Sequence, residues 1–493
     1  MKTRLAILLA IAATMHSCTQ QPTNVEQLNT LPNIYPDYIG VTIPVGIAPL
    51  NFSLSGKNEH NIWVEITGTD GTKIMSTTSN CTNFSLSEWH QLLSRNKGDS
   101  IAVSVCEQGE HKWQRYANFS IYVSPDTLSA FGLTYRRIAP GYEVYSHMGI
   151  YQRNLSNFSE EAIFDNNELT GACLNCHTSN RTSSESFLFH VRGENGATVV
   201  STNNKTDILN TATNQTIGLL VYPYWHPNGR YVAFSTNTTR QSFHEIKDKR
   251  IEVFDNASDI AVYDTQTHQL LLSPLFNGTK NALETFPVFS PSGEQLYFCS
   301  AVTQPIPSGL KDVCYTLCAT TFDANNGRFG TTTDTIINLT DKHLSITHPR
   351  PSYDGKYIMF TVANYGTFPI WHDEADLWLY DIQNQTYAPL CAANSNASDS
   401  FHNWSADSHW FVFTSRRDDG LFTRLYIAHI DDNGQTSKPF MLPQLDPKKY
   451  YQNLLYSYNT PDFVDAPIRF DVKSIARQLA LPDRQPITPI CQK

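Results

Sequence analysis

The residue pattern with the clearest chemistry is a Cys-x-x-Cys-His motif at residues 173–177. Two thiols three positions apart can add to the two vinyl groups of a haem, while the adjacent imidazole reaches the iron. Cys173 and Cys176 would then attach a c-type haem, and His177 would be an axial iron ligand. The alternatives are a Cys173–Cys176 disulfide or half of a zinc site, although the sequence has no second Cys-x-x-Cys to complete the commonest zinc arrangement.

A sixth iron ligand has to come from elsewhere in the chain. His190 lies 13 residues after His177, and the nearby Arg192 suits a haem propionate. The run 178–186 is entirely polar, so we expect a loop there. In a strand hairpin, His177 and His190 would instead be cross-strand neighbours, too close to hold opposite faces of one haem. Met148 is the other candidate, because Met/His ligation is common in such haems; the simpler alternatives are a buried strand histidine and a core methionine.

Other reactive side chains have simpler explanations. His372, Asp373 and Glu374 resemble a metal cluster, but the nearby Asp376 matches Asp259 in a repeated segment, which favours a structural role. The sequence has no Gly-x-Ser-x-Gly elbow, no zinc-protease His-Glu-x-x-His and no phosphate-binding glycine loop. We therefore assign no catalytic residue.

The N-terminus is typical of an exported protein. A basic start, 1–4, precedes an apolar run, 5–15, that is too short to span a bilayer but suits a signal peptide. Because Ser17 precedes Cys18 as in a bacterial lipobox, we expect residues 1–18 to be a lipoprotein signal peptide ending at a lipidated Cys18. The alternative is cleavage by an ordinary signal peptidase, with Cys18 incidental. This predicts a lipid anchor to a membrane of the bacterial cell envelope, with the protein facing the periplasm or the surface.

Composition narrows the class of protein. The chain has 493 residues, a net charge of −10 and only 36 Lys and Arg, so it lacks the basic footprint of a nucleic-acid-binding protein. Its many turn-forming and aromatic residues suit short strands better than long charged helices. Ten cysteines in an exported chain indicate an oxidising compartment without fixing any pairing.

The first third of the chain predicts a small domain and a connector. Residues 19–32 are polar and aperiodic, as in a tether. Short alternating runs over 33–124 predict an immunoglobulin-like β-sandwich in which Cys81 and Cys106 could pair. Residues 125–185, which include the Cys-x-x-Cys-His motif, are expected to form a connector.

The remainder repeats one pattern four times. Each unit has an aromatic or histidine start, a turn at Gly229, Gly293, Gly355 or Ser408, and an apolar strand. The strands end at equivalent phenylalanines, spaced 53 to 64 residues apart: Phe234, Phe298, Phe360 and Phe413. Repetition of a small sheet at this period is typical of a β-propeller, whose radial packing hides sheet faces and most edges. We expect an all-β protein with five or six blades, six favoured, over 186–470, followed by a tail, 471–493. The segment near 456–470 is expected to close the ring against an early blade.

These units resemble the TolB-type propeller repeat, with its Ser-Pro-Asp-Gly-like turn before a strand ending in Phe. The whole chain is similar to the TolB-like propeller lipoproteins of Bacteroides-type bacteria that carry one Cys-x-x-Cys-His. Further support comes from the segments 148–153, 368–376 and 415–420. The resemblance implies an architecture rather than a chemistry.

Three functions fit these observations. The favoured one is electron transfer or redox sensing by a single c-type haem (iron) on the propeller, with a redox or scaffold protein of the envelope as partner. The alternative is a non-enzymatic binding module without haem, docking an envelope protein or a glycan. An enzyme acting on peroxide would need an open sixth position on the iron.

Overall fold

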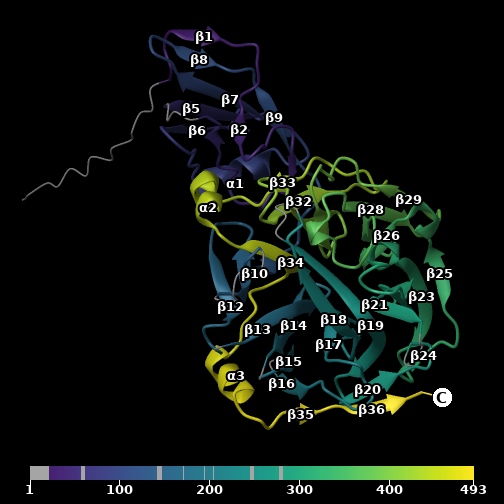
Figure 1. The fold of residues 1–493 in the computed structure, drawn as a ribbon. Helices are drawn as coiled ribbons and strands as arrows, with labels where there is room; N and C mark the ends of the chain where they lie inside the picture. The colour runs from purple at the N-terminus through teal and green to yellow at the C-terminus, as the bar shows by residue number, and fades with distance from the viewer. Residues whose placement is uncertain are drawn as a thin grey trace, which may run out of the picture.

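The computed structural model describes residues 21–56, 61–140, 147–169, 171–193, 195–203, 205–244, 249–276 and 281–492. The expected signal peptide and Cys18 lie outside these residues. Most described elements are strands, and six of the sheets are arranged around a common axis (Figure 1). The chain is therefore an all-β protein built on a six-bladed β-propeller. No described helix is long and apolar enough to cross a membrane.

Each blade is a twisted, mainly antiparallel sheet, and in blades 2 to 6 the first strand in the chain lies nearest the axis. Blades 1 to 3 contain the following elements: in blade 1, β10 (Gly132–Ile138), β11 (Gly149–Asn154) and β12 (Glu160–Asp165); in blade 2, β13 (Cys173–Asn180), β14 (Ser183–Arg192), β15 (Ala197–Thr202) and β16 (Lys205–Asn210); in blade 3, β17 (Leu220–Trp225), β18 (Tyr231–Phe243), β19 (Ile251–Asp264) and β20 (Gln269–Leu272).

Blades 4 to 6 follow in chain order. Their strands are, in blade 4, β21 (Ala282–Phe289), β22 (Gln295–Val302), β23 (Thr316–Asp323), β24 (Arg328–Phe329) and β25 (Asp334–Ile337); in blade 5, β26 (Ser345–Pro351), β27 (Tyr357–Ala363), β28 (Asp376–Asp381) and β29 (Thr386–Pro389); in blade 6, β30 (Asp399–Trp404), β31 (Trp410–Ser415), β32 (Arg424–His429) and β33 (Phe440–Met441). Three short 3-10 helices lie in loops, at Leu310–Asp312, Thr340–Lys342 and Pro369–Trp371.

The C-terminal segment closes the ring. After α2 (Pro447–Asn453), β34 (Ser457–Val464) pairs with β10 and becomes the innermost strand of blade 1. This confirms the closure expected near 456–470, and it removes the two sheet edges that an open ring would expose. The expected tail is also structured: after α3 (Val472–Leu479), β35 (Gln485–Pro486) and β36 (Thr488–Cys491) pair in parallel with β16 and β20.

The expected connector, 125–185, supplies blade strands instead. Its described residues include the three chain-local strands of blade 1 and the first strand of blade 2. The loop expected over 178–186 is wrong, because these residues form the β13–β14 hairpin, with Thr178 opposite Leu188 and Ser179 opposite Phe187. Of this polar run, Thr178 lines the central cavity, and the Ser179 backbone N–H donates to Asp462.

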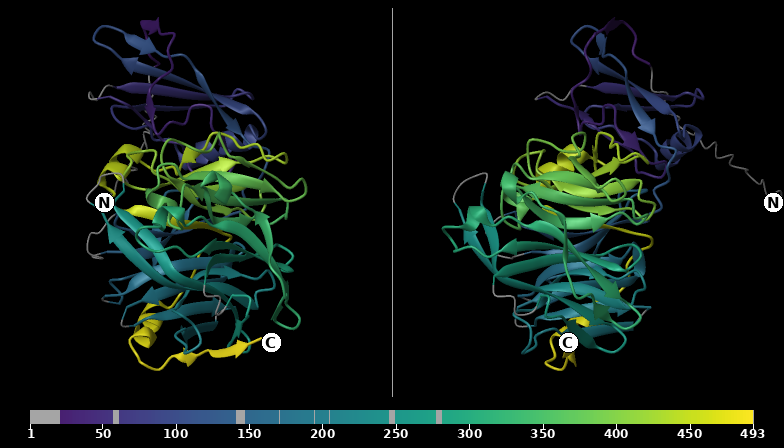
Figure 2. Two further views of the ribbon diagram at one scale, coloured as in Figure 1. Left: turned by 45° about the vertical axis from the view of Figure 1, so that its right-hand side comes forward. Right: turned by 90° about the vertical axis from the view of Figure 1, so that its right-hand side faces the viewer.

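The N-terminal domain packs against the edge of blade 6 (Figure 2). It has one seven-stranded sheet, a separate two-stranded sheet and one helix, and an immunoglobulin-like sandwich is not confirmed. Its elements are β1 (Val25–Gln27), β2 (Ile34–Tyr35), β3 (Thr42–Ile43), β4 (Ser53–Leu54), β5 (Ile62–Gly68), β6 (Lys73–Thr78), α1 (Leu86–Arg95), β7 (Ser100–Gln108), β8 (Trp113–Arg115) and β9 (Phe119–Val123). Part of the expected tether is thus a strand, since β1 pairs with β8. Cys81 and Cys106 are free thiols rather than a pair.

Candidate functional site

All six innermost strands are interrupted by a bulge at the same height. The first residue of each bulge has a left-handed backbone, with φ between 47° and 53°: Cys176, Tyr222, Phe286, His348, Phe401 and Thr460. At each of these points the pairing with the next strand shifts register. A bulge leaves its extra residue outside the ladder and re-aims the side chains around it. The six residues therefore form one ring around the axis, which we call the waist.

The residue after the bulge explains part of the Cys-x-x-Cys-His motif. Four blades have proline there, which costs nothing because the amide has no ladder partner at a bulge: Pro223, Pro287, Pro349 and Pro461. The other two blades have His177 and His402. No hydrogen bond of good geometry reaches a ring nitrogen of either histidine among the described residues, although the Thr134 backbone lies near His177 and those of Met359 and His348 near His402. Cys176 and His177 thus occupy a repeated structural position in blade 2, and the histidine is the unusual feature of it.

The inner strands enclose a cavity of about 280 Å³ on the axis. Its volume is close to the lower end of the ~300–1,000 Å³ that small-molecule sites have. The waist supplies an arc of aromatic rings on one side: the centroid separations are 4.5 Å for Tyr222–Phe286, 4.1 Å for Phe286–His348 and 5.0 Å for His348–Phe401. On the other side of the waist are the smaller Cys176 and Thr460.

The floor of the cavity lies two residues beyond the waist, where each strand turns a side chain inward. Thr178, Arg350, Asn403 and Asp462 line it. The Asn403 amide donates to Oδ1 of Asp462 at 2.8 Å, and the Ser179 backbone N–H donates to Oδ2 at 3.1 Å. Burial raises the pKa of Asp462 to about 7, although these donors and the Arg350 charge oppose the shift.

A strap lies across the axis beneath this floor. Arg181 in blade 2 and Tyr353 in blade 5 come from opposite sides of the ring. The Arg181 guanidinium donates to the Tyr353 carbonyl at 3.1 Å, and the Tyr353 hydroxyl donates to the Arg181 carbonyl at 3.1 Å. The guanidinium carbon also lies 5.2 Å from the tyrosine ring centroid. This strap spans the channel on the floor side of the cavity, and we call the opposite end the mouth.

Three arginines line the mouth of the cavity: Arg136, Arg192 and Arg416. The Arg416 guanidinium stacks on Trp371, 3.0 Å from the ring centroid, and burial lowers its pKa to about 9. The Nε atoms of Arg136 and Arg416 have no hydrogen-bond partner among the described residues. Buried guanidinium groups of this kind are costly unless an anion or acceptor meets them.

An extended hairpin of blade 3 reaches over the mouth. The far ends of β18 and β19 contribute Thr239, Gln241, Phe243, Ile251 and Val253 to the lining. A clamp from blade 5 holds this arm: the Tyr365 hydroxyl donates to Glu252 at 3.1 Å, and His372 lies 3.4 Å from Glu252 and 3.2 Å from Glu374.

The clamp accounts for the histidine and acidic residues that resembled a metal site in the sequence. Burial disfavours the charged form of His372, but its hydrogen bonds to Glu252 and Glu374 outweigh burial and raise its pKa to about 9. The group is thus an ion pair at neutral pH. Among the described residues, no three or more His, Cys, Asp or Glu side chains are arranged to hold a metal ion.

The haem-attachment residues of the motif all border the cavity. Cys173, Cys176 and His177 are among its lining residues, and both thiols are free. Burial raises the pKa of Cys176. Burial also lowers the pKa of His177 to about 3, with only partial compensation by the Thr134 backbone. The side chains fit covalent attachment of a group in the cavity, with a neutral imidazole beside it.

The two candidate distal ligands fit less well. His177 packs on Phe187, on the face of blade 2 that meets blade 1. His190 shares a face with Leu188, toward blade 3, and its Nδ1 is 3.0 Å from the Thr198 hydroxyl. The two histidines therefore lie on opposite faces of one sheet.

Met148 is buried near the motif, but an arginine lies between them. Nη2 of Arg136 is 3.9 Å from the Met148 sulfur and 3.8 Å from the Cys173 sulfur. A guanidinium in that position would have to move before the methionine could face a haem bound at the motif. Arg192, the predicted propionate partner, does line the cavity.

Sequence reasoning missed several residues of the cavity. Arg136, Arg350, His402 and Asp462 were not singled out. Part of the signal was present, because the four aligned repeats place Tyr224, Val288, Arg350 and Asn403 in one column. Asp462 and Thr178 could be added to that column only after blades 1 and 2 were known.

Comparison with known proteins gives no family. No protein-family model and no curated protein matches the chain. Among solved structures, it is similar to an oligogalacturonate lyase in complex with manganese, with 12% identity, 63% of this chain and 75% of that chain covered, and a TM-score of 0.36. It is also similar to the β-propeller domain of the Trilobed protease from Pyrococcus furiosus, with 11% identity, 69% and 82% coverage, and a TM-score of 0.33. The assignment of six blades rests on the sheet topology of this chain.

Proposed function

We propose that this protein is a non-enzymatic binding module whose central cavity captures a small anionic ligand. The observation that carries the proposal is the charge of the lining. Four arginines, Arg136, Arg192, Arg350 and Arg416, line the cavity, where Asp462 is the acidic residue among the described lining residues. Asp255 near Arg192, and Asp373 and Asp419 near Arg416, offset part of this charge. This excess of positive charge lies inside a chain whose net charge is −10.

The physical argument is that buried guanidinium groups need an acceptor. Hydrogen bonds between arginine and a carboxylate or phosphate are charge-assisted and directional, and they strengthen away from bulk water. The aromatic arc of the waist adds apolar surface for the body of the ligand. The ligand would enter at the mouth, beneath the arm that Glu252 and His372 hold in place.

The proposed location is the bacterial cell envelope. The apolar leader and Cys18 support a lipid anchor, with the propeller facing the periplasm or the surface. A binding module in that position would present its ligand to an envelope partner protein.

A covalently bound c-type haem is the second candidate occupant. Its specific support is that Cys173, Cys176 and the buried His177 all border the cavity. The thiols would attach the group, His177 would be the axial ligand, and Arg136 and Arg192 would meet its carboxylates. The haem would supply one-electron chemistry, and His190 and Met148 remain predicted distal ligands.

Thermal shift measurements with a matched pair of probes test the main proposal. Benzoate should raise the melting temperature of the full-length protein, and the neutral isostere benzamide should not. Arg136→Gln or Arg416→Gln should each weaken benzoate binding about tenfold, since a hydrogen bond to a charged group contributes about 1.5–3 kcal/mol. Arg469→Gln, which removes an exposed arginine outside the cavity, is the control. Equal shifts with both probes would refute an anion site.

The same preparation separates the haem candidate. Protein made with an intact cytochrome c maturation system should be examined by haem staining and by its pyridine haemochrome spectrum. Covalent haem that is lost in the Cys173→Ala, Cys176→Ala double variant would establish the second candidate in place of the first. Unmodified thiols in that protein would remove it.

A further inference from the structure

The residues at the floor of the cavity favour different ligand groups from those at its mouth. Asp462 is only 3% exposed, and its two carboxylate oxygens accept hydrogen bonds from the Asn403 amide and from the Ser179 backbone N–H. A carboxylate offers about four acceptor positions, so Asp462 can accept further hydrogen bonds from a ligand. Arg350 lies on the same floor, so donors and acceptors occur there together. The buried end of the ligand is therefore best matched by groups that both donate and accept hydrogen bonds.

Two buried imidazoles, those of His177 and His402, also border the cavity. No hydrogen bond of good geometry reaches their ring nitrogens among the described residues, although backbone groups of Thr134, Met359 and His348 lie nearby. Ligand groups that both donate and accept, such as hydroxyls, suit such nitrogens.

The waist favours a ligand with a flat, apolar face. Tyr222, Phe286, His348 and Phe401 form a continuous arc over four successive blades, while Cys176 and Thr460 leave space opposite. An aromatic wall beside a polar floor binds a ring that has C–H groups on its face and hydroxyls on its edge.

We infer that the ligand is an acidic sugar of the uronic acid type, with its carboxylate at the arginines and its hydroxyls on Asp462 and the buried imidazoles. This inference rests on the proposed anion site and names the class of anion. Each part of the cavity meets one chemical feature of such a molecule. The carboxylate pairs with the guanidinium groups, the ring face packs on the aromatic arc, and the hydroxyls form hydrogen bonds with the polar floor. The cavity volume of about 280 Å³ suits one or two sugar rings rather than a polymer.

Isothermal titration calorimetry with four probes tests the inference on the full-length protein. The probes are D-galacturonate and D-glucuronate, the neutral sugar D-galactose, and benzoate as an anion without hydroxyls. At least one uronate should bind ten or more times more tightly than D-galactose and than benzoate. The ratio of uronate affinity to D-galactose affinity measures the contribution of the arginines. The ratio of uronate affinity to benzoate affinity measures the contribution of the floor.

Two variants make the result specific to the floor. Asp462→Asn should weaken uronate binding at least tenfold and leave benzoate binding unchanged, which also shows that the variant is folded. Asp465→Asn removes an exposed carboxylate outside the cavity and should change neither. Benzoate binding as tight as uronate binding, unaffected by Asp462→Asn, would overturn the sugar while leaving the anion site standing. No binding of any of the three anions would remove the proposed function itself.

Discussion

A buried carboxylate at the floor of the cavity makes a prediction at the scale of single residues. Because burial raises the pKa of Asp462 to about 7, the folded protein holds this proton more tightly than the unfolded chain does. The stabilisation is therefore complete below the unfolded pKa of about 3.9 and is lost as the pH rises through about 7.

Replacing this group should change the pH dependence of stability. The side chain of Asp462→Asn stays neutral at every pH. The free energy of unfolding of this variant, relative to that of the parent, should therefore rise by roughly 2 kcal/mol between pH 5 and pH 8. His177 and His402, whose pKa values are lowered to about 3, act in the opposite direction, destabilising the fold as the pH falls below about 6.5. That contribution is common to both proteins and cancels in the difference. Urea unfolding at four pH values measures the effect, and parallel curves would contradict it.

The most distinctive motif of the sequence shows what residue patterns can and cannot give. The sequence motif singled out Cys173, Cys176 and His177, and all three border one cavity. It gave no sign that Cys176 is a bulge residue of a propeller blade, equivalent to Tyr222 in the next blade. The polar run 178–186 hid that equivalence, because the repeat is normally recognised by apolar strands.

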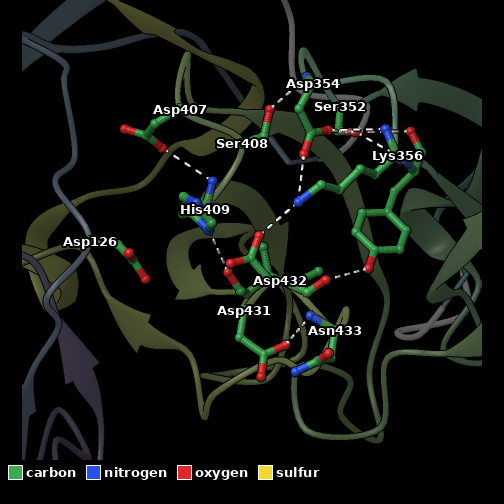
Figure 3. Close-up of polar contacts among 12 residues, drawn as sticks. Asp126, Ser352, Asp354, Lys356, Asp407, Ser408, His409, Asp431, Asp432 and Asn433 are labelled. Atoms are coloured by element: carbon green, nitrogen blue, oxygen red, sulfur yellow. Dashed lines mark hydrogen bonds and ion pairs between the residues drawn. The ribbon is translucent and has the colours of Figure 1, made fainter.

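At the scale of elements, the turns of blades 5 and 6 explain an exception in the repeat. Gly229, Gly293 and Gly355 have positive φ at one turn position, and Ser408 takes the same conformation at φ 62°. Its hydroxyl accepts a hydrogen bond of 3.1 Å from the backbone N–H of Asp354 in blade 5 (Figure 3). Beside it, Lys356 and Asp432 form an ion pair of 2.7 Å between the same blades.

Two substitutions at this turn separate the hydrogen bond from the backbone strain. Ser408→Ala loses a hydrogen bond of about 1 kcal/mol and keeps the left-handed conformation. Ser408→Gly loses the same bond but relieves a conformational cost of about 1–2 kcal/mol. We expect the alanine variant to be destabilised by about 1 kcal/mol and the glycine variant to match the parent or exceed it. Urea denaturation measures both, and equal losses in the two variants would show that strain at this turn is unimportant.

At the scale of the whole molecule, the sequence predicted the architecture better than the boundaries. Four repeats in phase, from Phe234 to Phe413, were enough to indicate a propeller and its closure by the C-terminal segment. The boundaries of blades 1 and 2 were missed because their inner strands lack the repeat signature: that of blade 1 comes from the far end of the chain, and that of blade 2 is polar. The N-terminal strands were recognised as strands, but alternation alone does not specify how they assemble into sheets.

Ring closure places the chain ends in different structural roles, and two truncations distinguish them. The C-terminal strands β35 and β36 only extend the outer edges of blades 2 and 3, along the side of the propeller away from the N-terminal domain (Figure 1). The strand β34 is different, because it is paired with β10 from Gly132–Val464 to Ile138–Ser457 and carries Asp462 into the cavity.

Deleting residues 481–493 should therefore lower the melting temperature by a few degrees and leave one cooperative transition, because the ring stays closed. Deleting residues 456–493 removes the innermost strand of blade 1, opens two sheet edges and exposes the core between blades 1 and 6. We expect that protein to lose cooperative unfolding and its response to benzoate together. Differential scanning calorimetry of the two truncations beside the parent measures the contrast. A protein without 456–493 that melts as one sharp transition near the parent temperature would mean that the other strands hold the ring closed without β34.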